Sequence, residues 1–234
     1  MALQRTDTHD TGGAPDARLH ARLDGRRPTT GHDAFFARGR IRWLRRCLDD
    51  LGERPRSMLA LGWDRGCTSS DFFAYLHIRS LVAVDVGHER ARTGELRSAD
   101  GRATYIHVAD YLATESADLA FTNRLFDHMT PTDRTAAAVL IHRSLKAGGL
   151  VSVWENNPWA PGTMWGAMPS GARGPSGRVT ARETRRLLRG VGFDIVHTTS
   201  AFFFPRGMAW AHGLEPLLAS IPLGGQYMVL ARKP

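Results

Sequence analysis

The stretch SMLALGWDRG, from Ser57 to Gly66, constrains the fold more than any other part of the sequence. It reads as a buried strand that runs into a turn interrupted by glycines, and a helix is expected to open directly after it, at one of residues 68–71. Parallel α/β sheets use such a turn and helix start to present backbone N–H groups to a nucleotide or a similar ligand. The stretch therefore predicts a cofactor site at the end of the first strand.

Apolar runs and helical segments alternate along the rest of the chain. Strands are expected at 80–86, 102–109, 117–122, 149–155, 193–204 and 226–232, and helices at 33–51, 71–78, 88–97, 131–146, 180–190 and 214–221. Nearly continuous apolar strands that alternate with helices indicate a parallel sheet covered on both faces. The sequence predicts one doubly wound, Rossmann-like α/β domain over residues 33–234, after a flexible tail over residues 1–32.

Positive charge is the main bias in composition, with a formal net charge of +8. Only Lys146 and Lys233 are lysines, so nearly all of this charge is arginine scattered through the chain. A nucleic-acid partner is therefore not expected, because such proteins gather their basic residues in a patch or stripe. The arginines of the helix expected at 33–51 are interpreted as a solvated face: Arg38, Arg40, Arg42, Arg45 and Arg46.

The two cysteines, Cys47 and Cys67, lack the paired spacing of a zinc or redox motif. Neither a bound metal nor a disulfide is expected. No apolar run approaches the roughly 20 residues of a membrane span, and no signal-peptide segment is evident. We therefore expect a soluble, cytoplasmic protein without membrane contact.

Two acidic residues follow successive strands, Asp85 after the second and Asp110 after the third. In an open parallel sheet these strand ends line the ligand crevice, so we assign both acids and their neighbours Val86 and Tyr111 to the cofactor site. A carboxylate about 20 residues past a glycine turn can accept both ribose hydroxyls, and Asp110 can accept from an adenine amino group. The alternative is that both acids cap helices. A dinucleotide site is disfavoured because the turn lacks the Gly-x-Gly-x-x-Gly pattern.

With these landmarks the sequence resembles the class I S-adenosylmethionine-dependent methyltransferases, especially the small single-domain members of natural-product pathways. The resemblance covers residues 55–233. Besides the glycine turn and the two acids, it rests on Phe126-Asp-His-Met129 where the family often has Leu-Glu-His-Leu, on Leu145-Lys-Ala-Gly-Gly-Leu150 where it has Leu-Lys-Pro-Gly-Gly-Leu, and on the ending 222–233. It implies a seven-stranded sheet with an antiparallel last strand and S-adenosylmethionine at the C-terminal ends of the first strands. It also implies methyl transfer to oxygen, nitrogen or carbon of a small biosynthetic intermediate.

The glycine turn departs from the family pattern, which usually reads acidic-x-Gly-x-Gly-x-Gly. Ala60, Gly62, Asp64 and Gly66 stand at those four positions. We assign Gly62, Asp64 and Gly66 to cofactor binding, since aspartate tolerates a positive φ better than most residues. The Asp64 carboxylate either repels the carboxylate of the cofactor or pairs with its ammonium group. The departures leave open a repurposed domain, either a cyclase-type enzyme or a non-catalytic partner subunit, with altered or lost cofactor use.

Methyl transfer is an in-line displacement at an activated sulfonium, so the protein mainly positions the nucleophile, excludes water and sometimes removes a proton. The resemblance places His128 beside the transferred methyl group, and imidazole titrates near neutral pH. His128 is therefore the candidate catalytic base, with a structural histidine at a strand end as the alternative. Asn123, just past the fourth strand, is assigned to the amino-acid end of the cofactor.

The acceptor is expected to contact Glu155 and Asn156 at the end of the fifth strand, where some relatives carry a histidine in place of Asn156. Trp159 and Trp165 lie in a Gly- and Pro-rich stretch, 158–177, which is interpreted as an acceptor lid. A second aromatic group, which includes Phe202 and Trp210, is interpreted as core or as a homodimer contact. The hypothesis that the protein methylates RNA rests on the net charge alone and is the weakest alternative.

Overall fold

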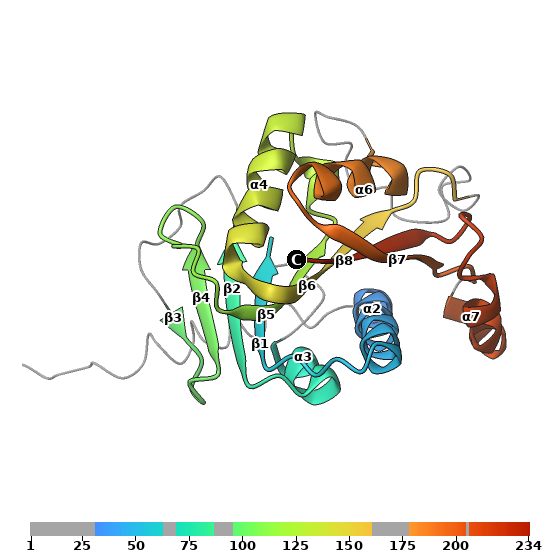
Figure 1. Cartoon of the computed structure of the whole chain (residues 1–234). Helices are drawn as coiled ribbons and strands as arrows, with labels where there is room; N and C mark the ends of the chain where they lie inside the picture. Colours follow the sequence, from blue (N-terminus) through green and yellow to red (C-terminus); the bar gives the residue numbers. More distant parts are fainter. Residues whose placement is uncertain (1–30, 63–68, 87–95, 161–177, 205) are drawn as a thin grey trace, which may run out of the picture.

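The computed structural model describes residues 31–62, 69–86, 96–160, 178–204 and 206–234. One sheet runs through the molecule with the strand order β3-β4-β2-β1-β5-β6-β8-β7 (Figure 1). Its strands are β1 (Ser57–Leu61), β2 (Ser80–Asp85), β3 (Leu96–Arg97), β4 (Ala103–His107), β5 (Ala117–Asn123), β6 (Leu145–Asn156), β7 (Asp194–Ala201) and β8 (Gln226–Arg232).

The pairing of the strands confirms the predicted sheet. β1 lies parallel to β2 and β5, β2 parallel to β4, and β5 parallel to β6. The last strand, β8, is antiparallel to both β6 and β7. These seven strands are the expected ones, and the two-residue β3 adds an antiparallel pairing at the edge of β4.

The prediction of a helix over residues 88–97 is wrong at its C-terminal end. Leu96 and Arg97 pair with Tyr105 and Thr104 of β4 and so belong to β3. Residues 88–95 lie outside the described part of the chain. The edge of β4 offers unpaired backbone groups, and bonding to it outweighs the helical tendency of this short segment.

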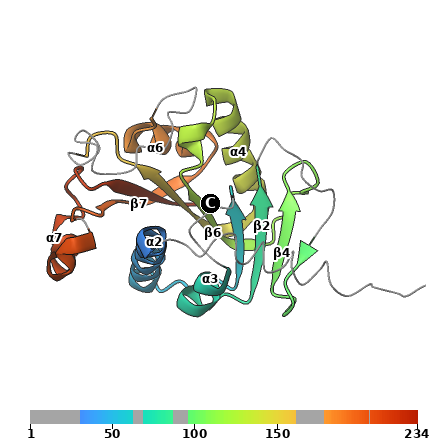
Figure 2. The ribbon, with the colours of Figure 1, turned by 180° about the vertical axis from the view of Figure 1, so that it is seen from behind.

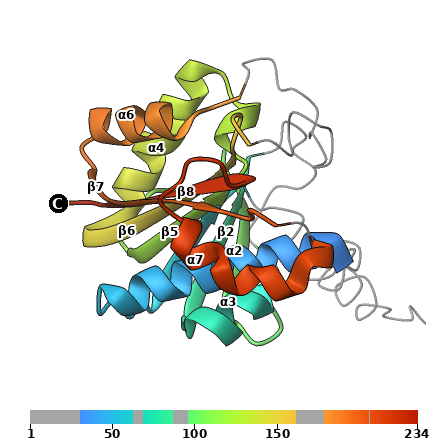
Figure 3. The ribbon, with the colours of Figure 1, turned by 90° about the vertical axis from the view of Figure 1, so that its right-hand side faces the viewer.

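Helices cover both faces of the sheet (Figures 1 and 2). α2 (Gly31–Asp50) and α3 (Ser69–Leu76) pack on one face, and α4 (Pro131–Ser144) and α6 (Ala181–Gly190) pack on the other. α7 (Glu215–Leu218) lies on the α2 side, as the side view in Figure 3 shows. Two short 3₁₀ segments, η1 (Phe126–His128) and η2 (Arg206–Leu214), complete the described elements.

The helix ends follow the expected chemistry. Thr180 and Glu183 form the predicted capping box, in which each side chain accepts from the backbone N–H of the other residue. Thr130 caps α4 in the same sense by accepting from the Asp133 N–H, with Pro131 at the first helical position. Both caps satisfy N–H groups that a helix leaves without internal partners.

Phe202, directly after β7, packs against α2, which agrees with the prediction that it belongs to the core. Its ring packs edge-on against Phe36, with 4.8 Å between the ring centres, and it is buried. A Cβ at Gly39, in the middle of α2, would lie 2.5 Å from this ring, so glycine is needed there for close packing. Trp210 is exposed.

Of the expected tail over residues 1–32, only Gly31 and His32 are described, and they form the start of α2. Within the described residues, no helix combines the length and apolar character that crossing a bilayer requires.

Candidate functional site

Four strands bring the predicted cofactor residues to one edge of the sheet. Gly62 follows β1, Asp85 ends β2, Asp110 follows β4 and Asn123 ends β5. The register aligns these ends, because Leu61 lies beside Val84 on one side and beside Thr122 on the other. Ligands of doubly wound sheets bind at this edge.

Gly62 has a conformation and a packing that both require glycine. Its φ is +71°, in the left-handed region, and its N–H donates to the Val84 carbonyl at 3.0 Å. A Cβ at this position would lie 2.6 Å from Cδ1 of Leu125. The turn that leaves β1 therefore depends on glycine for its backbone conformation and for its packing on Leu125. Asp64 and Gly66 lie outside the described residues.

The two acids stand on neighbouring strands. Asp85 is exposed at the end of β2, and its backbone carbonyl accepts from the Val108 N–H at 2.8 Å, which ties the loop after β4 to β2. Asp110 is half-buried in that loop, where its N–H donates to the His107 carbonyl at 2.9 Å. The structure thus places both acids where the sequence predicted them, at adjacent strand ends.

The residues that follow these acids in the sequence, Val86 and Tyr111, pack on the face of the sheet that α4 covers. Val86 is half-buried against the apolar cluster on this side of the sheet. The Tyr111 hydroxyl donates to Oγ of Ser144 at 3.0 Å. Tyr111 therefore anchors the segment after β4 to the last turn of α4, and a role of its ring in cofactor binding stays a prediction.

Asn123 is buried at the end of β5, directly before a sharp bend. The next residue, Arg124, has a φ of +51°, and its N–H donates to the Trp154 carbonyl at 2.7 Å. A positive φ is uncommon for a residue with a side chain and is often found at functional sites. The bend turns the chain from β5 into η1, which carries the candidate base.

His128 is the last residue of η1 and is exposed. Glu155 holds the start of the same segment, since Oε1 accepts from the Phe126 N–H at 2.7 Å and Oε2 from the Asp127 N–H at 3.4 Å. Glu155 itself is 0% exposed. The expectation that Glu155 contacts an acceptor therefore gives way to a positioning role, in which its carboxyl group fixes η1 from inside the protein.

A buried polar network extends from this carboxyl group. Burial raises the pKa of Glu155 well above its usual value, and the nearby Asp127 carboxyl raises it further. Burial also raises the pKa of Asp127, whose Oδ1 accepts from the Val179 N–H at 2.9 Å. The Tyr227 hydroxyl donates to the Val179 carbonyl at 2.9 Å and lies 2.9 Å from the Thr184 hydroxyl of α6. Two carboxyl groups in such surroundings resist being ionised together.

A second polar chain crosses the end of β6. Nε2 of Gln226 donates to Oδ1 of Asn156 at 3.1 Å, and Nη1 of Arg40 donates to Oε1 of Gln226 at 3.2 Å. Arg40 is only 4% exposed, so its assignment to a solvated face is wrong. The sequence carried a signal for this, because position 40 continues the buried stripe of Ala37, Ile41 and Leu44.

Of the two predicted lid tryptophans, Trp159 is 68% exposed and Trp165 lies outside the described residues.

Three residues of these polar networks were not predicted from the sequence: Asp127, Tyr227 and Gln226. All three fall within stretches that carry the family resemblance, Asp127 within 126–129 and the other two within 222–233, but no role was assigned to them there. Among the described residues no group of three His, Cys, Asp or Glu side chains is arranged to hold a metal ion.

Neither a protein-family model nor a curated protein matches the sequence. Solved structures match the fold. The 1,6-didemethyltoxoflavin-N1-methyltransferase of Burkholderia thailandensis, solved with 1,6-didemethyltoxoflavin and S-adenosylhomocysteine, is 18% identical, with 100% of this chain and 93% of that chain covered and a TM-score of 0.54. A possible histamine N-methyltransferase from Thermotoga maritima is 18% identical, with 86% and 93% covered and a TM-score of 0.56. The chain has the class I S-adenosylmethionine-dependent methyltransferase fold.

This methyltransferase fold is not restricted to methyl transfer. The cyclase SpnF is 20% identical to the chain, with 81% of this chain and 80% of that chain covered and a TM-score of 0.50. At these identities the comparisons establish the architecture, and the chemistry of the site has to be argued from its own residues.

Proposed function

We propose that this protein transfers a methyl group from S-adenosylmethionine to oxygen, nitrogen or carbon of a small biosynthetic intermediate. The observation that supports the proposal most directly is the meeting of Gly62, Asp85 and Asp110 at one edge of a methyltransferase-type sheet. An exposed carboxylate at the end of β2, next to the glycine turn that leaves β1, fits the cofactor, because a carboxylate in this place can accept from ribose hydroxyls. When bound, the cofactor supplies an activated methyl group.

His128 is the proposed base for an acceptor that must lose a proton. It is exposed, it follows β5, and its backbone is held by the Glu155 carboxyl group through the start of η1. An imidazole is the side chain that most often acts as a general base, provided that it lies within hydrogen-bond reach of the proton it removes. The Burkholderia neighbour, named as an N-methyltransferase of a small heterocycle, supports an acceptor of comparable size.

Titration of S-adenosylhomocysteine by calorimetry tests cofactor use. Asp85→Asn should weaken binding by about tenfold or more, because a hydrogen bond to a charged group is lost. Asp50→Asn is the matched control, since Asp50 is an exposed acid at the end of α2, and it should bind like the unmodified protein. Equal affinities for all three proteins, or no binding at millimolar ligand, would refute the proposed site.

A repurposed enzyme of the cyclase type is the second candidate, favoured by Ala60 and Asp64 in the glycine turn. It predicts that cofactor binds but that no acceptor is methylated. Asp64→Gly separates the two cases. Tighter binding of S-adenosylmethionine in this variant would indicate a degraded cofactor site, and weaker binding would indicate that Asp64 pairs with the cofactor.

A further inference from the structure

An open pocket of about 680 Å³ lies at the opposite edge of the sheet, where β1, β2 and β5 begin. Its walls come from residues 53–57, 79–80, 116, 118, 146–150 and 232. None of the predicted cofactor or acceptor residues lines it, since those residues follow the other ends of the strands. The volume suits a small molecule of nucleotide size.

The lining of this pocket is strongly basic. Five basic side chains face two acidic ones, Glu53 and Asp118, and the basic residues are Arg54, Arg56, Arg79, Lys146 and Arg232. Both acids are already bound, Glu53 to Arg232 at 2.9 Å and Asp118 to Lys146 at 2.6 Å. The pocket therefore has an excess of positive charge that its own acids do not neutralise.

Arg54 pairs with Asp49, outside the lining, at 2.7 Å, so the remaining excess is carried by Arg56 and Arg79. Within the part of the chain that the structure describes, neither guanidinium group has a hydrogen-bond or ion-pair partner, and both residues are exposed. Their backbones are joined, because the Arg79 N–H donates to the Arg56 carbonyl at 2.7 Å. This backbone hydrogen bond keeps the two arginines next to each other. A neighbouring pair of arginines suits one multiply charged anion, since each guanidinium group can bind two phosphate oxygens at once.

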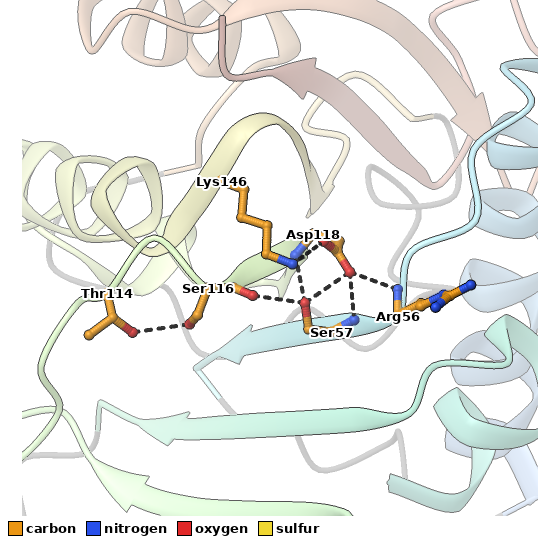
Figure 4. Close-up of polar contacts among 6 residues, drawn as sticks. All are labelled: Arg56, Ser57, Thr114, Ser116, Asp118 and Lys146. Atoms are coloured by element: carbon orange, nitrogen blue, oxygen red, sulfur yellow. Dashed lines mark hydrogen bonds and ion pairs between the residues drawn. The ribbon is translucent and has the colours of Figure 1, made fainter.

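Asp118 fixes the rim of the pocket beside Arg56, as Figure 4 shows. Its Oδ2 accepts from the Arg56 N–H at 2.8 Å, from the Ser57 N–H at 2.9 Å and from the Ser57 hydroxyl at 2.9 Å, while Oδ1 accepts from Nζ of Lys146. The same Ser57 hydroxyl lies 2.8 Å from the Ser116 carbonyl, so its single proton is shared between these two acceptors. The backbone from which the Arg56 side chain extends is thus held in place by side-chain hydrogen bonds at the rim.

We propose that this pocket binds a small molecule with two or more phosphate charges, held chiefly by Arg56 and Arg79. A nucleic acid would need a basic track along the surface, whereas Arg56 and Arg79, which lack a side-chain partner among the described residues, line one concave pocket. The site is separate from the proposed methyl-transfer site.

Tripolyphosphate and ATP, each without metal, are the probes for calorimetry at 150 mM salt. Both should bind saturably below about 1 mM, and the double variant Arg56→Gln/Arg79→Gln should weaken binding about tenfold or more. The matched control is Arg182→Gln/Arg186→Gln, which removes the same charge from two exposed positions on α6 and should leave the affinity within about twofold. ATP that binds more tightly than tripolyphosphate would show that the pocket also contacts the nucleoside.

Two results would overturn the proposal. These are the absence of saturable binding of tripolyphosphate and ATP, and equal weakening of binding in both double variants. S-adenosylhomocysteine titration of the Arg56→Gln/Arg79→Gln protein should give unchanged affinity. This last measurement keeps failure of the anion site distinct from failure of the proposed methyltransferase site.

Discussion

Adding one methyl group at Gly62 should disturb the turn that leaves β1 in two separable ways. The residue has a φ of +71°, which a side chain disfavours, and its added Cβ would lie 2.6 Å from Cδ1 of Leu125. Gly52 provides the matched control, because its φ is also +71° but no atom lies within 4 Å of a Cβ built there. The pair Gly62→Ala and Gly52→Ala therefore separates the backbone cost from the packing cost.

The two costs can be estimated independently. A left-handed backbone with a Cβ costs roughly 1–2 kcal/mol, and overpacking a buried contact costs typically about 1–3 kcal/mol more. Leu125 is buried, so its tip cannot move into solvent to relieve the contact. We expect Gly52→Ala to lower the free energy of unfolding by roughly 1–2 kcal/mol and Gly62→Ala by roughly 2–5 kcal/mol.

Urea denaturation of both variants measures these changes, and a Leu125→Ala background tests the cause. Removing the Leu125 side chain should lower the cost of Gly62→Ala to that of Gly52→Ala. Gly62→Ala should also weaken S-adenosylhomocysteine binding, while Gly52→Ala should not. If both alanine variants lose the same stability, or if Leu125→Ala leaves the cost of Gly62→Ala unchanged, the packing argument fails.

Three further changes test the buried carboxyl network, the rim of the anion pocket and a helix cap. Burial raises the pKa of Glu155, so the stabilisation that Glu155 contributes is complete below about pH 4.5 and is lost as the pH rises. A glutamine side chain carries no charge at any pH, so the stability of Glu155→Gln relative to the unmodified protein should increase between pH 5 and 8. Urea denaturation at a series of pH values measures this difference. For Asp118 burial raises the pKa, but bonds from Lys146 and Ser57 outweigh this and lower it to about 2 from 3.8. The stabilisation that Asp118 contributes is therefore present above pH 3.8 and is lost as the pH falls towards 2. At pH 7, Asp118→Asn should lower the free energy of unfolding by roughly 1–2 kcal/mol, allowing for the 28% exposure of the side chain. In denaturation curves, the difference in stability between the variant and the unmodified protein should vanish near pH 2. Thr180→Ala removes the capping box of α6 and should lower the unfolding free energy by about 1 kcal/mol in the same assay.

The strand pattern could be predicted because it depends on local sequence. Each inner strand is a short apolar run bounded by turn residues, and burial on both faces of a parallel sheet demands that composition. The capping box Thr180–Glu183 was predictable for the same reason, since its bonds join residues three positions apart. β3 was not, because two residues form a strand only when an edge lies ready to pair with them.

The direction in which a polar side chain points could not be predicted from its place along a strand. Glu155 and Asn156 are adjacent at the end of β6, yet the first is fully buried beneath η1 and the second is half-buried beside Gln226. Alternation along the strand sends neighbours to opposite faces. Which face holds the ligand depends on how η1 and α2 dock, and this depends on contacts distant in sequence.

The two proposed sites lie at opposite edges of the sheet, and the distance between them bears on how they can influence each other. Asp85 and Asp110 lie where the strands end, while Arg56 and Arg79, which have no side-chain partner in the part of the chain that the structure describes, lie where the strands begin. β1 spans five residues between them, or about 17 Å, which exceeds the screening length of about 8 Å at physiological salt. Charge at one edge should therefore have little influence on ligand affinity at the other. If binding of the cofactor still changes the affinity for the anion at 150 mM salt, the cause must be a shift of β1 or β2 rather than the electrostatic field of the charges.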